Sequence, residues 1–252
     1  MKNIAILGGR GMLGTELAKF AKDNSISVEI FDIPEFDIRR EKDIESVCSR
    51  FKTIINCAAF TDVDGAESNK EKCRAINGLA VGMLGEIAHK NKDKIIHIST
   101  DFVFGDIDKH PLNEQSRVNP LCWYGMTKLE GERLLSESNC EHIILRVEWT
   151  YGKHGNNFIK KIIEKARHEN QIRVVSDQIG SPTHTAEVAK AIFCLIHKNA
   201  NGLFHFAAES YASRFDVAKF LIEKTNMKTE VIQCLSSDFK VTALRPKNSM
   251  FD

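Results

Sequence analysis

The N-terminal segment is the part of this 252-residue chain that most constrains its fold. Residues 4–7 form a short, continuously apolar run, which is typical of a strand buried on both faces. Four glycines follow, and the apolar positions of residues 11–22 then recur at the three- and four-residue spacing of an amphipathic helix. The segment therefore predicts a strand, a glycine turn and a helix, which together begin a βαβ unit.

The same alternation continues along the chain. Further strands are predicted at 28–31, 53–57, 95–99 and 142–147, and further helices at 42–51, 69–90, 124–137, 158–168, 186–197 and 215–225. Residues 102–119, with two prolines and several polar residues, are predicted to form a loop. Strands that alternate with helices pair in parallel, so we expect an α/β fold, a Rossmann-type doubly wound parallel sheet with a smaller lobe.

The glycine turn indicates a ligand. Gly8, Gly9, Gly11 and Gly14 satisfy both the G-x-G-x-x-G and the G-x-x-G-x-x-G spacing, so the register of the turn stays open. Such glycines let backbone N–H groups approach a pyrophosphate at the positive end of a helix, and the last one allows close packing of helix on sheet. A glycine-rich turn without a ligand is the alternative, and the flanking strand and helix argue against it. We therefore predict a dinucleotide site.

The second predicted strand supports this site. Asp32 ends that strand, eighteen residues beyond Gly14, where a carboxylate can accept hydrogen bonds from both adenosine ribose hydroxyls. It would repel a 2′-phosphate, which favours NAD(H), but Arg39 and Arg40 lie nearby and keep NADP(H) open. The predicted cofactor is NAD(H) or NADP(H). The alternative for Asp32 is a solvated loop acid.

Tyr124 and Lys128 are the candidate catalytic pair. They stand four residues apart in a predicted helix, so both project from one face. An ammonium and an oxidised nicotinamide would lower the pKa of the tyrosine and make it a usable proton donor. Ser99 and Thr100 end the preceding strand, so three hydroxyls are expected to converge on one carbonyl. A surface ion contact and simple turn chemistry are the alternatives.

Composition excludes several classes of protein and of partner. The formal net charge is +1, so no sequence-wide field favours nucleic acid or an anionic membrane. The seven cysteines are scattered without a C-x-x-C pair, which argues against zinc and against a disulfide framework. No apolar stretch approaches the length of a membrane span. A cytoplasmic protein without a metal is expected.

Two regions are expected to divide the work. Residues 1–150 would form the dinucleotide-binding Rossmann domain, because the predicted strands lie there. Residues 151–252 would form mainly a substrate-binding lobe, interleaved with the sheet and packed on it directly, because no flexible linker separates them.

The order of glycine turn, Ser-Thr pair and Tyr/Lys pair resembles an extended short-chain dehydrogenase/reductase. A narrower resemblance, to the dTDP-4-dehydrorhamnose reductase family, covers essentially the whole chain. It is carried by six motifs in order: NCAAFTDVDGAE at 56–67, STDFVF at 99–104, YGMTKLEGE at 124–132, LRVEWTYG at 145–152, DQIGSPT at 177–183 and LRPKNSMFD at 244–252.

The resemblance implies NAD(P)H-dependent reduction of the C4 ketone of a nucleotide-linked 6-deoxy-hexose, with Tyr124 as the proton donor to O4 and Lys128 and Thr100 beside it. Some family members carry a magnesium site at a dimer interface, and Glu16 would correspond to one of its acidic residues. A single glutamate on a helix is not enough to predict a metal site, so no metal is expected. A homodimer stays open. The resemblance places Gly11, Met12, Leu13, Asp32, Asp37, Ile38, Ala58, Ala59 and Thr61 around the cofactor, and Thr100, Asp101 and Trp149 around the sugar. Gly8 and Gly14 of the glycine turn are also expected to contact the cofactor, as are Tyr124 and Lys128, of which the lysine can bind the nicotinamide ribose.

Three departures from the family pattern bear on the substrate. Phe102 stands where the family usually has tyrosine, and Glu148 replaces a small hydroxyl residue before the tryptophan. A changed polar group can change which sugar is accepted. Family members also continue beyond the LRPKNSMFD motif, so an abbreviated lobe or an incomplete chain is expected.

Two other functions remain as alternatives. One is a non-catalytic dinucleotide-binding regulatory subunit, which occurs in the same family, although Tyr124 and Lys128 argue against it. The other is a nucleotide-sugar epimerase, which would hold NAD tightly and release no reduced cofactor.

Overall fold

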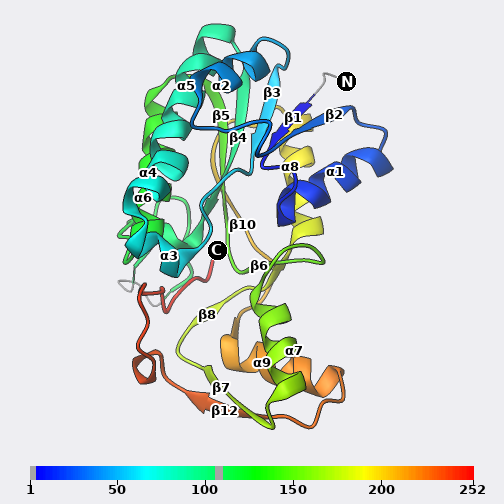
Figure 1. The fold of residues 1–252 in the computed structure, drawn as a ribbon, viewed down its shortest axis with the longest axis vertical. Coiled ribbons are helices and arrows are strands. Elements are labelled where there is room, and N and C mark those ends of the chain that lie inside the picture. Colours follow the sequence, from blue (N-terminus) through cyan, green and yellow to red (C-terminus); the bar gives the residue numbers. More distant parts are fainter. Residues whose placement is uncertain (1–3, 106–109) are drawn as a thin grey trace.

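A computed structural model describes residues 4–105 and 110–252, and a six-stranded parallel sheet lies at its centre (Figure 1). The strand order is β10-β5-β4-β3-β1-β2. The strands are β1 (Ile4–Leu7), β2 (Val28–Phe31), β3 (Thr53–Asn56), β4 (Lys94–Thr100), β5 (Glu141–Val147) and β10 (Gly202–Phe206). The order reverses between β1 and β3, and ligands of open α/β sheets bind at the carboxyl edge beside such a reversal. The predicted fold class is confirmed.

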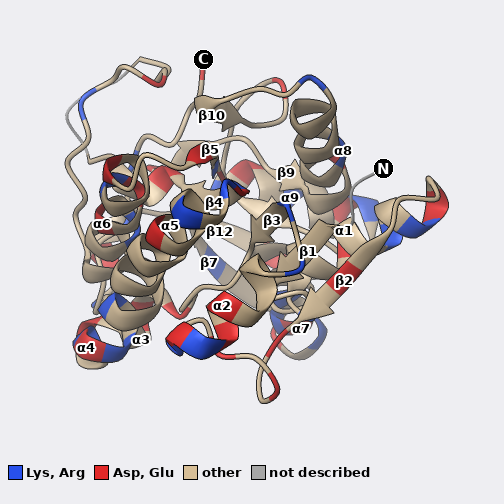
Figure 2. Cartoon of the chain, turned by 90° about the horizontal axis from the view of Figure 1, so that it is seen from above, with Lys and Arg blue, Asp and Glu red and all other residues tan. Residues whose placement is uncertain are grey.

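Helices cover both faces of the sheet (Figure 2). On one face α2, α5 and α6 enclose an apolar core, and on the other α1 and α8 pack against each other and enclose a second core. The helices around the sheet are α1 (Met12–Asp23), α2 (Glu41–Cys48), α3 (Val63–Ser68), α4 (Lys70–Arg74), α5 (Ala80–Asn91), α6 (Trp123–Glu137) and α8 (Thr185–His197), with a short 3-10 turn η2 (Asp101–Val103) after β4. Both faces of the central strands are thus buried, as their apolar sequences predict.

The structure divides the helix predicted at 69–90. It consists of α4, a π-helical turn η1 (Ala75–Leu79) and α5. The side chain of Asn77, inside this turn, bonds to the backbone of Phe60 and also contacts Cys73 of α4. Apolar periodicity continues through such a turn, so it could not reveal the change in winding.

A smaller layer lies below the sheet and consists of two helices beside short strands (Figure 1). Its elements are α7 (Phe158–His168), α9 (Arg214–Lys224), β7 (Gln171–Val175), β12 (Glu230–Cys234), β8 (Ile179–Gly180) and β11 (Ala212–Ser213), with a 3-10 turn η3 (Ser236–Asp238). Two further short strands, β6 (Thr150–Tyr151) and β9 (Thr183–His184), pair between this layer and the sheet. The chain forms α7, β7 and β8 of the lower layer, returns to the sheet as α8 and β10, and then completes the lower layer with β11, α9 and β12. Several segments of the chain therefore connect the sheet and the lower layer.

The last residues run back from the lower layer to the loop after β4 (Figure 1). Ile179 bonds to the backbone of Lys247 and Ser249, and Leu112 bonds to that of Met250 and Asp252. Part of the predicted loop, residues 106–109, lies outside the described residues. The C-terminal strand-like segment therefore ties the lower layer to the edge of the sheet where ligands bind.

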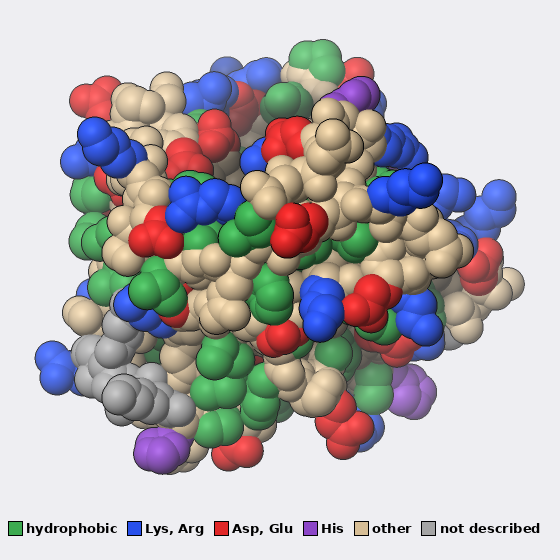
Figure 3. Space-filling model, turned by 90° about the horizontal axis from the view of Figure 1, so that it is seen from below, with side chains coloured by type: hydrophobic (Ala, Val, Ile, Leu, Met, Phe, Trp, Pro, Cys, Tyr) green, Lys and Arg blue, Asp and Glu red, His purple; other side chains and the backbone are tan. Residues whose placement is uncertain are grey.

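The surface carries both signs of charge. On the face of the lower layer seen in Figure 3, basic and acidic side chains are interspersed. Within residues 4–105 and 110–252, no helix is both long and apolar enough to cross a bilayer.

Candidate active site

The glycine turn is as tight as the sequence predicts. Gly8 has a φ of +69°, and a Cβ there would lie 2.7 Å from the backbone nitrogen of Ala58 at the end of β3. A Cβ on Gly14 would lie 2.5 Å from the carbonyl oxygen of Gly8. Gly9 is closed in the same way, because its Cβ would overlap the side chain of Ile30 on β2. Backbone alone fits here, which leaves a cradle for a phosphate group.

The N-terminus of α1 opens into this cradle. Gly11 is the N-cap, and among the residues that the structure describes no side chain caps the first amides of the helix. The side chain of Leu13 packs on the sheet, and that of Met12 lies beneath Gly155 and within 3.8 Å of the Asn157 amide nitrogen. Met12 and Leu13 would therefore contact an anion through their backbone N–H groups, which lie at the positive end of the helix.

Asp32 faces the same turn. One carboxylate oxygen accepts the backbone N–H of Arg10 at 2.8 Å and the other that of Ile33 at 2.8 Å. Each oxygen keeps a further lone pair for a ribose hydroxyl. The Arg10 guanidinium lies alongside, bonded to Glu35 at 2.9 Å. The Asp32 carboxylate and the Arg10 guanidinium thus lie together where a 2′-hydroxyl or 2′-phosphate of the cofactor would be recognised.

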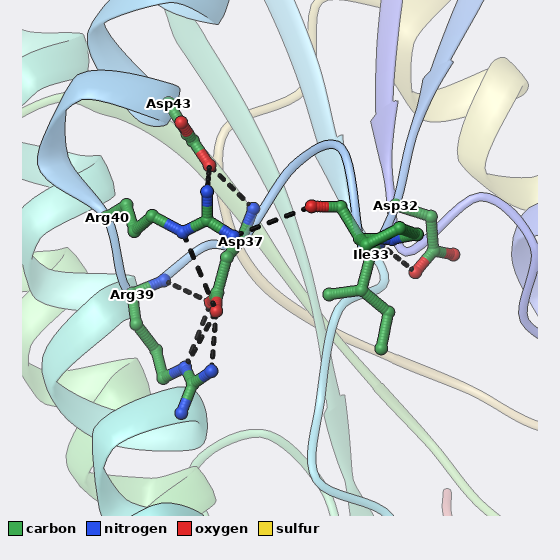
Figure 4. A network of polar contacts seen from close by, with 7 residues as sticks. Asp32, Ile33, Asp37, Arg39, Arg40 and Asp43 are labelled. Carbon is green, nitrogen blue, oxygen red and sulfur yellow. Dashed lines mark hydrogen bonds and ion pairs between the residues drawn. The ribbon is translucent and has the colours of Figure 1, made fainter.

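The side chains of Asp37 and Ile38 make contacts within the protein. The Asp37 carboxylate pairs with Arg39 and also faces Arg40 (Figure 4). The hydrogen bond from Arg39 lowers the pKa of Asp37 to about 2, so this carboxylate is ionised. The side chain of Ile38 is buried in the apolar core. At this position the two residues could offer a cofactor their backbone, and the ion pairs hold the loop in shape.

The loop after β3 forms the second side of the cradle. Ala58 and Ala59 are partly exposed and Thr61 is exposed. Asn77 pins this loop, since its side chain accepts the Phe60 N–H at 2.8 Å and donates to the Phe60 carbonyl at 3.1 Å. Asn77 was missed by the sequence reasoning, and its burial within an apolar helix pattern is the signal that could have identified it.

Tyr124 and Lys128 project from one face of α6 toward the sheet. The Tyr124 ring is partly exposed and packs edge-on against Phe102, with ring centroids 5.4 Å apart. Lys128 is buried, and its ammonium nitrogen lies 2.6 Å from the Ile98 carbonyl oxygen and 3.1 Å from Nε2 of His97. Tyr124 thus keeps some exposed surface at the edge of the sheet, while the lysine contacts the backbone and a histidine of β4.

Only one hydroxyl of the Ser99-Thr100 pair faces Tyr124. Thr100 interacts with the phenol, whereas the Ser99 hydroxyl donates to Glu132 in the interior. Successive residues of a strand point to opposite faces, so the two hydroxyls cannot share one site. The prediction that three hydroxyls converge is therefore wrong, and Tyr124 and Thr100 are the two that meet.

In the protein without a ligand, burial determines whether the Tyr124 phenol is protonated. It raises the pKa of Tyr124, with the Asp101 carboxylate adding to the effect and the Thr100 hydrogen bond opposing it. An ammonium group and an oxidised nicotinamide next to the phenol would act in the other direction. Without a ligand, Tyr124 is protonated at neutral pH, which suits a proton donor.

The predicted sugar-binding residues gather around a buried charge cluster. Asp101 accepts hydrogen bonds from Thr100 at 2.9 Å and from Ser249 at 2.6 Å. Trp149 has a φ of +42°, which is rare outside glycine, and the Arg214 guanidinium lies 3.5 Å from the centre of its ring. The strained backbone and the stacked cation hold the indole in one orientation beside the cluster.

Glu148, the residue before this tryptophan, is completely buried, and its carboxyl group lies near Ser181 and Phe251. Burial, reinforced by Asp101, raises the pKa of Glu148 to about 8. A carboxyl group whose pKa is raised by folding stabilises the fold at low pH, and this contribution is lost as the pH rises from its unfolded value to about 8. Glu148 is thus neutral near pH 7.

We expect Glu148→Gln to be more stable than the wild type at alkaline pH. One pKa unit corresponds to about 1.4 kcal/mol, so the advantage at pH 9 should reach roughly 2–4 kcal/mol and vanish near pH 4. Urea unfolding of both proteins across this pH range measures it. Glu130→Gln, which removes a partly exposed acid of α6, is the control and should gain nothing at pH 9. Parallel pH curves for Glu148→Gln and the wild type would show that Glu148 ionises freely.

The described residues hold no group of three histidine, cysteine, aspartate or glutamate side chains arranged for a metal ion. Glu16 is buried on α1.

The whole chain matches the model of a known protein family. The model of the RmlD substrate binding domain matches residues 1–252. A dTDP-4-dehydrorhamnose reductase of Aggregatibacter actinomycetemcomitans is 34% identical, over 100% of this chain and 91% of its own length. The spore coat polysaccharide biosynthesis protein SpsK of Bacillus subtilis is 28% identical, over 99% of this chain and 89% of its own.

Solved structures agree with this match. A dTDP-4-dehydrorhamnose reductase of Bacillus anthracis in complex with NADP superposes with a TM-score of 0.95 at 33% identity, covering 100% of this chain and 90% of that one. A UDP-glucose 4-epimerase of Thermus thermophilus in complex with NAD reaches 0.81 at 17% identity, covering 97% and 90%, which shows a shared fold alone.

Proposed function

Because the chain belongs to the RmlD substrate binding domain family over its whole length, we propose that it is an NAD(P)H-dependent reductase of the C4 ketone of a nucleotide-linked 6-deoxy-hexose, of the dTDP-4-dehydrorhamnose reductase type. It would act in rhamnose or related deoxy-sugar biosynthesis. The observation that carries the proposal is the partly exposed Tyr124 phenol beside Thr100, at the carboxyl edge of the sheet that also bears the glycine cradle.

The cradle fits the dinucleotide. Gly8 and Gly14 leave room only for backbone, the N-terminus of α1 is open, and Asp32 presents lone pairs beside it. The bound reduced nicotinamide supplies the hydride. Tyr124 donates its phenolic proton to the oxygen that becomes the new hydroxyl, and Thr100 helps to hold that oxygen in place. Lys128 would contribute positive charge next to the tyrosine.

The substrate is held from the lower layer and the edge of the sheet. Asp101 and Trp149 are the residues that we assign to the sugar, and the Arg214 guanidinium keeps the indole in position. Phe102 contributes an apolar ring where a tyrosine would offer a hydroxyl, so the sugar is recognised here with one polar group fewer. This substitution favours a substrate that does not need that contact.

The proposal is tested by following NADH or NADPH absorbance after adding dTDP-4-dehydro-6-deoxy-L-mannose to the purified protein. Oxidation of the cofactor supports the reductase. Bound cofactor without oxidation on this or other 4-keto sugars would favour a regulatory protein, and tightly bound NAD in the isolated protein would favour an epimerase.

We expect Asp32→Ala to change the cofactor preference. The variant loses the acceptor for the ribose hydroxyls and the repulsion of a 2′-phosphate, while Arg10 remains alongside. The ratio of kcat/KM for NADPH to that for NADH should rise roughly tenfold, about the worth of one hydrogen bond to a charged group. Steady-state rates with both cofactors measure it.

Glu29→Gln is the matched control for this experiment. It removes an acid of the same strand that pairs with Arg50 away from the turn, and it should leave the ratio unchanged. An unchanged ratio in Asp32→Ala would mean that Asp32 does not contact the cofactor.

A cytoplasmic location and a homodimer are part of the proposal. All seven cysteines are free, as expected where thiols stay reduced. Sedimentation of the purified protein tests the dimer.

A further inference from the structure

A buried histidine lies behind the active-site lysine. His97 on β4 is completely buried, and its two ring nitrogens contact one side chain each: Nε2 lies 3.1 Å from Nζ of Lys128, and Nδ1 lies 3.1 Å from Nδ2 of Asn56. Asn56 is the residue paired with His97 across β3 and β4, and it is also buried. The three side chains thus form one chain of polar contacts running inward from the active site.

The donor and acceptor in each of these hydrogen bonds can be assigned starting from Asn56. The Oδ1 atom of Asn56 accepts the backbone N–H of Ala58 at 3.1 Å, in the loop that forms the cofactor cradle. The amide must therefore point its NH₂ group at His97, so Nδ1 of the ring is the acceptor. A neutral histidine with an acceptor at Nδ1 carries its proton on Nε2. His97 then donates toward Lys128.

A donor aimed at Nζ suits an uncharged amine. A neutral amine has one lone pair, which accepts from His97, and it can still donate to the Ile98 carbonyl at 2.6 Å. An ammonium group has only donors and would meet the Nε2–H proton head-on. From this geometry we propose that Asn56 and His97 are positioning residues that lock the tautomer of the histidine and thereby favour the uncharged form of Lys128 in the cofactor-free protein.

The surroundings of the lysine act in the same direction overall. Burial lowers the pKa of Lys128 to about 8, against the opposing influence of Glu132 on α6, Cys57 after β3 and Cys73 on α4. Burial also lowers the pKa of His97 well below its usual range, with Lys128 and His142 on β5 adding to this, so the ring stays neutral. Lys128 is thus poised to change charge near neutral pH.

The inference rests on the proposed function for its consequence. Lys128 supplies the positive charge next to Tyr124, so its loss of a proton sets the alkaline limit of reductase activity. Asn56 and His97 do not touch the reacting atoms; they adjust that limit through Lys128, and they connect it to the cradle because Ala58 holds the Asn56 amide.

The direct test needs neither substrate nor cofactor. ¹⁵N NMR of histidine-labelled protein, with His97 assigned from its backbone, reports which ring nitrogen carries the proton. We expect a neutral ring protonated at Nε2 at pH 9, where Lys128 has lost its proton. Protonation at Nδ1 would overturn the inference.

Asn56→Asp reverses the inner end of the chain. Its carboxylate can accept from both Ala58 N–H and a protonated Nδ1, which frees Nε2 to accept from an ammonium group. The pH midpoint of the Lys128 ¹³Cε shift, and the alkaline limb of kcat, should each rise by about one pH unit. A tautomer that switches while the Lys128 midpoint stays fixed would overturn the link between the two residues.

His142→Gln is the matched control, because it changes a histidine on the neighbouring strand that bonds to the Cys140 carbonyl and leaves the Asn56 contact intact. It should leave the Lys128 midpoint in place, and an equal rise there would overturn the inference. A wild type that fails to oxidise NAD(P)H contradicts the proposed function only, since both NMR readouts are obtained without turnover.

Discussion

Tyr124→Phe is expected to lower kcat by roughly 10²–10⁴-fold while the protein still binds the reduced cofactor, because general acid catalysis by a positioned side chain contributes about that much. The ring is held edge-on by Phe102, and α6 packs so closely that a Cβ on Gly125 would overlap the Phe102 carbonyl. Phenylalanine can keep this packing and lacks only the proton. Stopped-flow oxidation of NADH with saturating sugar measures the loss in the chemical step.

The control for this variant is Tyr211→Phe. Tyr211 lies in the lower layer, and its hydroxyl donates to the Phe251 carbonyl at 2.6 Å. The control variant therefore loses the same kind of hydroxyl at a position outside the proposed proton path. It should keep most of the wild-type kcat. Full activity in Tyr124→Phe would remove the tyrosine from the mechanism, and cofactor binding measured by fluorescence separates a chemical defect from misfolding.

The sheet and its first turn were predictable because they depend on local pattern. Residues 4–7 and 28–31 are strands with the predicted bounds, and the glycine turn joins the first of them to α1. Apolar runs and glycines at fixed spacing reflect constraints within a few residues of one another. For the same reason the fold class followed from the order of elements alone.

The edge strand β10 and the strands of the lower layer were not predicted. β10, with the sequence GLFHF, is partly exposed along its length and lies at the edge of the sheet, so it lacks the continuous apolar run of a central strand. β7 and β12 pair across 54 or more residues of chain, which no local pattern can show. Such elements take their structure from partners far away in the sequence.

The polar interior was the least predictable part of the site. Asp101 bonds to Ser249, 148 residues away, and Arg214 at the start of α9 stacks on Trp149, which lies between β5 and β6. These contacts depend on how the lower layer meets the sheet. His97, by contrast, could have been noticed as an ionisable residue in the middle of the apolar run IIHI at 95–98, because a buried polar group needs a partner.

A second polar group inside the core anchors the catalytic helix. Glu132 lies two turns beyond Tyr124 on α6, on the face that also bears Lys128, and pairs with Arg146 of β5 through bonds of 2.9 and 2.6 Å. Both side chains are almost fully buried, with 6% and 4% of their surface exposed, and the Ser99 hydroxyl also donates to Glu132. The pair therefore joins α6 to the two strands beneath it.

Arg146→Met should destabilise the protein by roughly 3–5 kcal/mol, because it leaves the Glu132 carboxylate buried without its partner. Urea unfolding at pH 7 measures the change. Arg50→Met is the matched control: its partner Glu29 is exposed, so the cost should stay below about 1 kcal/mol.

Replacing both members of the buried pair separates the penalty of an unpaired charge from the worth of the pair. In Glu132→Met with Arg146→Met the charge is gone, and apolar side chains of similar length occupy the space, so much of the lost stability should return. Such a recovery would mean that the main role of the pair is to position α6. In that case kcat should fall in the double variant although the fold is restored, because Tyr124 and Lys128 lie on the same face of α6. A double variant as unstable as Arg146→Met would instead show that the ion pair itself stabilises the fold.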